Sequence, residues 1–142
     1  MHFASEQTAR KREEIVRCHI DAENKHDIAG VIATFDQPKY EVMPLGAVLD
    51  GAQPVTDFLS GVFSGFPDFA AQVPSLTHAE NGVIAEGHFT GTHKHDWSGI
   101  PATGRAVNVP FCAIFVFEED RCLGERLYFD FATLLRQLGV LQ

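Results

Sequence analysis

The apolar residues of this chain change their spacing once, near residue 67, and this change limits the folds that the chain can adopt. Before it, apolar side chains recur with the three- and four-residue spacing of helices that pack one face on a core. After it, apolar and polar residues alternate, as in strands with one buried face. The helical spacing is most regular at Val55, Phe58, Leu59, Val62, Phe63 and Phe66. Helices that precede strands in this way predict an α+β fold.

Three helices are expected in the first half of the chain. The first is predicted to run from Ser5, a suitable N-cap, to about His26, and the second is capped by Asp27 and ends near Phe35. The third begins near Pro54, because proline suits the first turn of a helix. The side chains predicted on the buried face of the first helix are Ile15, Cys18, His19, Ala22 and His26.

The remaining elements are predicted strands and one final helix. Asn81-Gly82 is typical of a tight turn between two antiparallel strands. Gly87 and Gly91 lie inside a strand, where glycine suits a sharp bend. A strongly curved antiparallel sheet of this kind can wrap around the helices and form a cone with an internal cavity, and we expect residues 1–142 to form one such domain. The strands are expected at residues 40–43, 69–78, 83–93, 107–117 and 123–130, and the helix at residues 132–138.

Charge and composition exclude several classes of function. Eleven Lys and Arg residues against 19 Asp and Glu residues leave a net charge of −8, with no basic patch for the phosphates of a nucleic acid. No apolar stretch is long enough to span a membrane, and the first residues lack the apolar core of a secretion signal. The three cysteines are odd in number and lack C-x-x-C spacing. We therefore expect a cytoplasmic protein whose cysteines are small core residues.

Two segments of the second half resemble the SnoaL-like polyketide cyclases of the nuclear-transport-factor-2-like (NTF2-like) superfamily. They are Gly91-Thr92-His93 followed by G-I-P-A-T-G-R at residues 99–105, and D-x-x-x-L-L-x-Q-L-G at residues 130–139. The resemblance implies an α+β cone with a cavity for a small hydrophobic ligand or carbonyl substrate. It also implies intramolecular aldol or related carbonyl chemistry driven by an acidic side chain, with no metal ion and no organic cofactor.

Asp130 matches the aspartate that serves as general acid and base in those cyclases. It would remove a proton next to two carbonyl groups and then protonate the carbonyl that is attacked. An apolar cavity would raise the pKa of such a carboxyl group and strip its water, which suits this chemistry. The alternative is that Asp130 caps the last helix by accepting the amides of Ala132 or Thr133. The sequence leaves both roles open.

Four further residues are candidates for the cavity. The resemblance puts His93 at the start of a loop over the cavity, where it would orient Asp130 or polarise a carbonyl group; the alternative is a core or loop histidine. Tyr128 shares the face of Asp130 by strand alternation and would donate to a carbonyl oxygen. His19 lies on the buried face of the first helix, and Trp97 is expected at the mouth of the cavity. The alternative for His19 is a histidine of the core or of an interface, and the alternative for Trp97 is a contact between subunits.

A metal site is the weaker interpretation of the histidines. His93 and His95 are spaced to point the same way on a strand, and a third ligand would come from His19 or Asp130. No recognised zinc spacing accompanies this pair. We therefore expect no metal ion.

One departure from the family favours a different function. The strand at residues 109–117 is almost wholly apolar, whereas many relatives carry polar residues there that hold the catalytic aspartate. The alternative function is therefore non-catalytic binding of a hydrophobic small molecule. In either case we expect a homodimer or higher homo-oligomer, because Ile84, Thr90, Thr92 and the strand at residues 107–117 offer an outer face for pairing.

Overall fold

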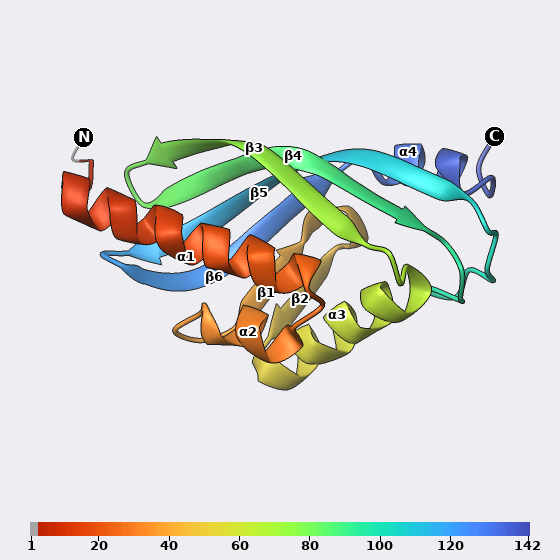
Figure 1. The fold of residues 1–142 in the computed structure, drawn as a ribbon, viewed down its shortest axis with the longest axis horizontal. Coiled ribbons are helices and arrows are strands. Elements are labelled where there is room, and N and C mark those ends of the chain that lie inside the picture. The colour runs from red at the N-terminus through yellow and green to blue at the C-terminus, as the bar shows by residue number, and fades with distance from the viewer. Residues whose placement is uncertain (1–2) are drawn as a thin grey trace.

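The computed structural model describes residues 3–142, in which helices cover one face of a six-stranded sheet (Figure 1). Figure 1 shows α1 running along the sheet, with α2 and α3 beneath it and α4 near the C-terminus. The order of elements confirms the predicted α+β fold. In chain order they are α1 (Glu6–Asn24), α2 (Ile28–Ala33), β1 (Lys39–Val42), a 3₁₀ turn η1 (Met43–Leu45), β2 (Ala47–Asp50), α3 (Ala52–Gly65), β3 (Ala70–Ala79), β4 (Gly82–Thr92), β5 (Ala106–Glu118), β6 (Arg121–Phe129) and α4 (Phe131–Gln137).

The described strands form one open sheet in the order β2-β1-β6-β5-β4-β3. Neighbouring strands are antiparallel except β1 and β6, which run parallel, so the expectation of an entirely antiparallel sheet is wrong at this pair. A tight turn forces antiparallel pairing, whereas β1 and β6 are joined only through α3 and several other strands. The edge strand β2 is absent from the prediction because four residues are too few to show an alternation.

Side-chain caps fix where the first two helices begin. At the start of α1, Oγ of Ser5 accepts the backbone amide of Thr8 at 3.1 Å. At the start of α2, Oδ1 of Asp27 accepts the amide of Gly30 at 3.0 Å. Each cap satisfies an amide that has no partner within its helix, and both confirm the predicted helix starts.

A bulge lies where β3 and β4 approach each other closely. Gln72 pairs with His88 and Ser75 pairs with Glu86, so two residues of β3 lie opposite Gly87. A Cβ atom at Gly87 would lie 1.9 Å from the carbonyl oxygen of Gln72, and only glycine fits this approach. A bulge of this kind bends and twists the strands, which lets the sheet curve around the helices.

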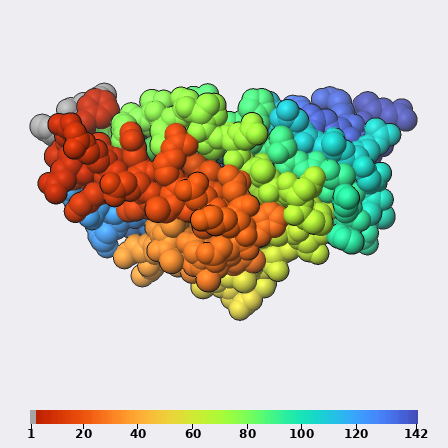
Figure 2. Space-filling view, in the orientation of Figure 1, coloured from red at the N-terminus to blue at the C-terminus, as the bar shows by residue number. Residues whose placement is uncertain are grey.

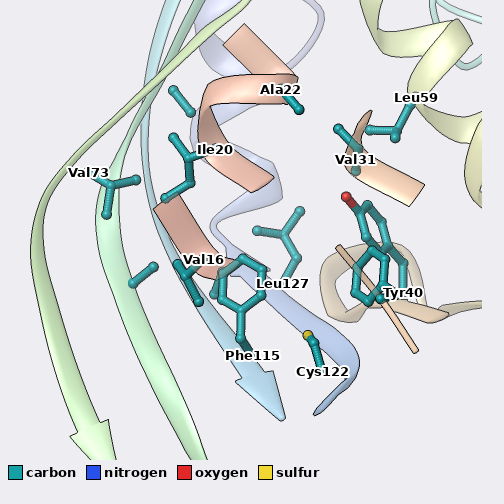
Figure 3. Packing of buried hydrophobic residues seen from close by; sticks show 14 of the residues in the cluster. Val16, Ile20, Ala22, Val31, Tyr40, Leu59, Val73, Phe115, Cys122 and Leu127 are labelled. Atoms are coloured by element: carbon teal, nitrogen blue, oxygen red, sulfur yellow. The ribbon is translucent and has the colours of Figure 1, made fainter. Parts of the chain in front are cut away.

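The core lies between the sheet and the first three helices. Figure 3 shows Phe115 and Leu127 of the sheet in the same cluster as Val16 and Ile20 of α1. In the space-filling view of Figure 2, the atoms of α1, α2 and α3 cover much of the front of the molecule. A smaller cluster joins α4 to β5 and so covers one end of the same face. It consists of Phe66, Val107, Val109, Leu134 and Leu138.

The structure tests the expected burial of the cysteines and the expected absence of a membrane-spanning segment. All three cysteines are free, but only Cys122 is buried; Cys18 is exposed and Cys112 is half-buried. The prediction that all three are core residues is therefore wrong, because Cys18 lies on the outer side of α1 and Cys112 on the outer face of the sheet. Within residues 3–142, no helix combines the length and the apolar character needed to cross a membrane.

The close approach at Gly87 leads to a stability prediction. Gly87→Ala is expected to lower the free energy of unfolding by about 2 kcal/mol or more, because β3 and β4 have to move apart. Gly61→Ala is the matched control, since Gly61 lies in α3 with no atom within 4 Å of its Cβ position. Alanine there is expected to stabilise the helix by about 0.5–1 kcal/mol. Urea unfolding measures both, and equal stability of Gly87→Ala and the parent would contradict the close approach.

Candidate functional site

An apolar cavity of about 90 Å³ lies between the sheet and the helices. A buried water needs only about 10–15 Å³ by the same kind of measure, so the cavity has room for a small organic molecule. Ten aromatic side chains contribute to its wall, including eight of the twelve phenylalanines of the chain. Besides Trp97, the residues of the wall with polar side chains are Glu23, Tyr40, Thr90 and Glu125.

Glu23, Tyr40 and Glu125 each contact His19 beside the cavity. Nε2 of His19 lies 2.7 Å from Oε1 of Glu23, 3.3 Å from Oε2 of Glu125 and 3.1 Å from the hydroxyl oxygen of Tyr40. All four side chains are buried or nearly so, with 0% of His19, 13% of Glu23 and 7% of Glu125 exposed. His19, Glu23, Tyr40 and Glu125 are called the polar cluster below.

The fold brings the polar cluster together from three distant segments. His19 and Glu23 are four residues apart on α1, and this spacing places them on one face of the helix. Tyr40 on β1 is the cross-strand partner of Glu125 on β6. The parallel pairing of β1 with β6 therefore sets these two side chains beside each other on the inner face of the sheet.

Thr34, at the end of α2, fixes the orientation of the His19 ring. Oγ1 of Thr34 lies 2.9 Å from Nδ1 of His19 and donates its own hydrogen to the carbonyl oxygen of Val31 at 2.6 Å. Oγ1 is therefore the acceptor, and Nδ1 carries a hydrogen. Nε2 then faces the two carboxyl groups, and it donates to Glu23 when His19 is protonated.

The cluster shifts the pKa values of its members. Burial alone would lower the pKa of His19, but Glu23 and Glu125 outweigh it and raise this pKa to about 10. Burial raises the pKa of Glu125, opposed by its interactions with His19 and Tyr40. Burial and the two carboxylates raise the pKa of Tyr40 well above its usual value. His19 is thus a cation at neutral pH, and Glu125 keeps a proton to higher pH than an ordinary glutamate.

Glu125 also holds a buried oxygen that makes no hydrogen bond, although it lies 3.3 Å from Nε2 of His19. Among the described residues, Oε2 of Glu125 and Nε2 of His93 are the buried side-chain polar atoms that have no hydrogen bond. A buried polar atom left in this state costs about 1–3 kcal/mol. Such atoms usually have a ligand, an ordered water or a chemical role, and Glu125 belongs to the wall of the cavity.

Asp130 lies elsewhere. Its Oδ1 accepts the amide of Ala132 at 3.1 Å and its Oδ2 accepts the hydroxyl of Thr133 at 2.7 Å, so it caps α4. The side chain is exposed, and the hydrogen bond from Thr133 lowers its pKa. The expectation that Asp130 is sheltered in the cavity is wrong, because strand alternation turns it away from the inner face. The capping alternative describes its position, and a catalytic role has no geometric support.

The other predicted site residues are also separated from one another. Tyr128 is 40% exposed on the outer face of the sheet, because it shares the face of Asp130. His93 is fully buried and stacked on Phe66, with Nδ1 accepting the amide of Thr103 at 3.3 Å, but it is not part of the wall. The structure brings only two of the predicted residues to the cavity. They are Trp97, in the wall, and His19, in the polar cluster.

A metal ion would need three ligands close together. Among the described residues, only His19, Glu23 and Glu125 bring three such atoms within 4.8 Å of one another, and His93 and His95 belong to no such group. Tetrahedral zinc separates its ligand atoms by about 3.3 Å, since each bond is about 2 Å long. The 2.7 Å between His19 and Glu23 is shorter than this and is typical of a hydrogen bond. The geometry therefore favours a shared proton in this cluster.

The sequence contains a signal for Glu125 and Glu23 that the prediction does not use. Glu125 alternates in phase with Leu127 and Phe129, so it is an acidic residue on the apolar face of its strand. Glu23 follows His19 by four residues on the buried face of the first helix. Tyr40 has no comparable signal, because its place depends on the parallel pairing of β1 with β6.

Comparisons with known proteins agree with this architecture. The family model described as SnoaL-like polyketide cyclase matches residues 13–138. No curated protein matches the sequence.

Solved structures with the same fold are distant in sequence. AclR from Streptomyces galilaeus is 21% identical, with a TM-score of 0.80 over 94% of this chain and 98% of its own. TsrD from Streptomyces laurentii is 22% identical, with a TM-score of 0.78 over 96% and 98%. A protein with a ketosteroid isomerase-like fold from Catenulispora acidiphila, solved in complex with trimethylamine, is 16% identical, with a TM-score of 0.77 over 91% and 94%. These likenesses show a shared fold.

The pKa of His19 predicts how stability depends on pH. Because this pKa rises from 6.5 to about 10 on folding, the stabilisation is complete below pH 6.5 and is lost as the pH rises toward 10. The free energy of unfolding is expected to fall between about pH 6.5 and 8.5, by at most about 1.4 kcal/mol per pH unit from this group. The raised pKa of Glu125 also makes stability fall as the pH rises, beginning at the ordinary glutamate pKa of 4.5. Urea unfolding across this range measures the slope, and His19→Asn is expected to make it shallower.

His78 provides the matched control. Its Nε2 lies 2.6 Å from Oε1 of Glu13, which is also on α1, but the histidine side chain is 31% exposed. His78→Asn leaves the polar cluster intact, so the part of the slope that His19→Asn removes is expected to remain in this variant. A slope that is the same in His19→Asn and the parent would show that His19 is not a buried cation.

Proposed function

Since this chain belongs to the SnoaL-like polyketide cyclase family, we propose that it is an enzyme that transfers protons on a small, apolar carbonyl compound inside the cavity. The carboxyl group of Glu125 is its general acid and base. The single observation that carries this proposal is the buried Oε2 of Glu125, which makes no hydrogen bond and lies in a mostly apolar wall. Burial gives a carboxylate the basicity that removal of a carbon-bound proton requires.

The reaction begins and ends at Glu125. The ionised carboxylate takes a proton from the carbon next to a carbonyl group, and the resulting enolate attacks a second carbonyl of the same molecule. The protonated carboxyl group then returns its proton to the oxygen of the attacked carbonyl. No other reactant is consumed. The apolar wall keeps water from protonating the enolate before the ring closes.

The neighbours of Glu125 support its ionised state. Protonated His19, held by Thr34 and Glu23, places a positive charge 3.3 Å from Oε2 while Glu125 is ionised. The interaction of Tyr40 with Glu125 favours the same ionised state. Asp130 and His93 are assigned no step in this scheme, since neither belongs to the wall of the cavity.

The second candidate function is binding without turnover. The apolar wall favours it, since a hydrophobic molecule would gain burial there without any chemical step. The distant structural relative from Catenulispora acidiphila holds trimethylamine, which indicates that this fold accepts small molecules. Proton transfer to the ligand distinguishes the two functions.

Hydrogen exchange tests the role of Glu125. Exchange of carbon-bound hydrogen for deuterium in cyclohexanone and acetophenone requires only the first proton transfer, and NMR in D₂O follows it. Glu125→Gln keeps the shape of the side chain and is expected to lower the catalysed exchange by about 10²-fold or more. Asp130→Asn is the matched control and is expected to retain the parent rate within about threefold. Equal rates in Glu125→Gln and the parent would refute acid–base catalysis by this residue.

We also propose that the outer face of the sheet joins two copies of the chain. Strand alternation turns a row of apolar side chains outward on β4, β5 and β6, where they are half-buried or exposed. A two-fold axis would bury the same patch on both copies. The apolar side chains of this face are Ile84, Cys112, Ile114, Val116 and Tyr128.

Light scattering after size-exclusion chromatography tests this pairing. The parent is expected at twice the mass of one chain, and Ile114→Lys at the mass of one chain, because the charge would be buried in the interface. Val48→Lys is the control, since Val48 is 64% exposed on the edge strand β2. A parent protein with the mass of one chain would contradict the proposal.

A further inference from the structure

We infer that the cavity admits uncharged and positively charged apolar molecules and excludes carboxylates and other anions, and that Glu23 sets this preference. The inference rests on the proposed function, because it names the class of substrate for the same site. It follows from the charges around the cavity and from the hydrogen-bond donors that the polar cluster has already used.

His19, the positive charge that the described residues place beside the cavity, has no free donor for an anion. Nδ1 of His19 donates to Thr34 at 2.9 Å, and Nε2 faces Oε1 of Glu23 at 2.7 Å. The imidazole is fully buried and is not part of the wall. No lysine or arginine among residues 3–142 lines the cavity, and the other donors that these residues bring to the wall, such as Trp97, are uncharged. A bound anion would therefore meet no cation.

The charges of the cluster do not balance. When both glutamates are ionised, one imidazolium faces two carboxylates, and little solvent is present to screen the remaining negative charge. Adding a second unpaired negative charge to such a site is strongly unfavourable. An uncharged ligand avoids this cost. A cation would pair with Oε2 of Glu125 and with the faces of the aromatic rings in the wall.

Glu23 creates this imbalance because it pairs with the imidazolium of His19 and accepts its Nε2 hydrogen. Nε2 lies 2.7 Å from Glu23 and 3.3 Å from Glu125. The hydrogen on Nε2 is therefore donated to Glu23. Without the charge of Glu23, His19 and Glu125 would form a neutral pair. The amide of a glutamine at position 23 would also bring donors to the wall. Glu23 is therefore the residue that determines the charge specificity of the site.

Three compounds of one shape and different charge test the inference. They are isobutyramidinium, isobutyramide and isobutyrate, and isothermal titration at about pH 8 measures their binding to the full chain. The parent is expected to bind isobutyramide at least about tenfold more tightly than isobutyrate, and isobutyramidinium at least as tightly as isobutyramide. In Glu23→Gln, the preference for isobutyramide over isobutyrate is expected to fall below about threefold.

Two further variants separate charge from structure. Glu23→Asp keeps the negative charge and is expected to keep the parent preference. Glu13→Gln removes a carboxylate from the same helix, one that lies 2.6 Å from Nε2 of His78 but is exposed, and it is also expected to keep the preference. Circular dichroism establishes that each variant is folded before binding is compared.

Several outcomes would overturn the inference. Isobutyrate binding to the parent as tightly as isobutyramide would do so, and so would an unchanged preference in Glu23→Gln. Failure of all three compounds to bind would also count against it, because the inference requires an uncharged molecule of this size to enter. The proposed function fails separately, if Glu125→Gln retains hydrogen exchange while the charge preference persists.

Discussion

The structure depends on one buried interaction, the contact of the His19 imidazolium with the carboxylates of Glu23 and Glu125. Removing three ionisable groups from water is expensive, and it is tolerated only when charges are paired and hydrogen bonds are satisfied. Here the pairing is nearly complete. The two N–H groups of the imidazolium are donated to Thr34 and Glu23, whereas Oε2 of Glu125 has the nearby positive charge but no hydrogen bond. The chemistry of the site follows from this single unsatisfied atom.

The rest of the fold supports that interaction. The bulge opposite Gly87 curves the sheet, and the curved sheet leaves an apolar cavity of about 90 Å³ next to Glu125. Most of the phenylalanines of the chain line this cavity, so the wall keeps water from the polar cluster. The low polarity strengthens each electrostatic contact inside it. A site that transfers protons and discriminates by charge is the expected result of this arrangement.

The fold could be predicted in most of its parts from local patterns. The caps at Ser5 and Asp27 and the apolar series of α3 identify helices through contacts within a few residues, and alternation identifies the long strands. The parallel pair of β1 with β6 could not be predicted, because the two strands lie far apart in the chain. The site was less predictable. Motif resemblance led to Asp130, whose strand position faces outward, whereas Glu125 is in phase with the apolar face.

The sequence by itself determined the class of fold, the helix starts, the bend at Gly87 and the aromatic character of the interior. Each of these depends on the chemistry of one residue or on the spacing of near neighbours. Only the tertiary structure decided which acidic residue faces the cavity and which histidine accompanies it. Glu125, Tyr40 and His19 come from three segments, and their meeting depends on strand order and helix packing. Such long-range contacts leave no local pattern, because each residue fits the helix or strand that contains it whether or not the other residues are nearby.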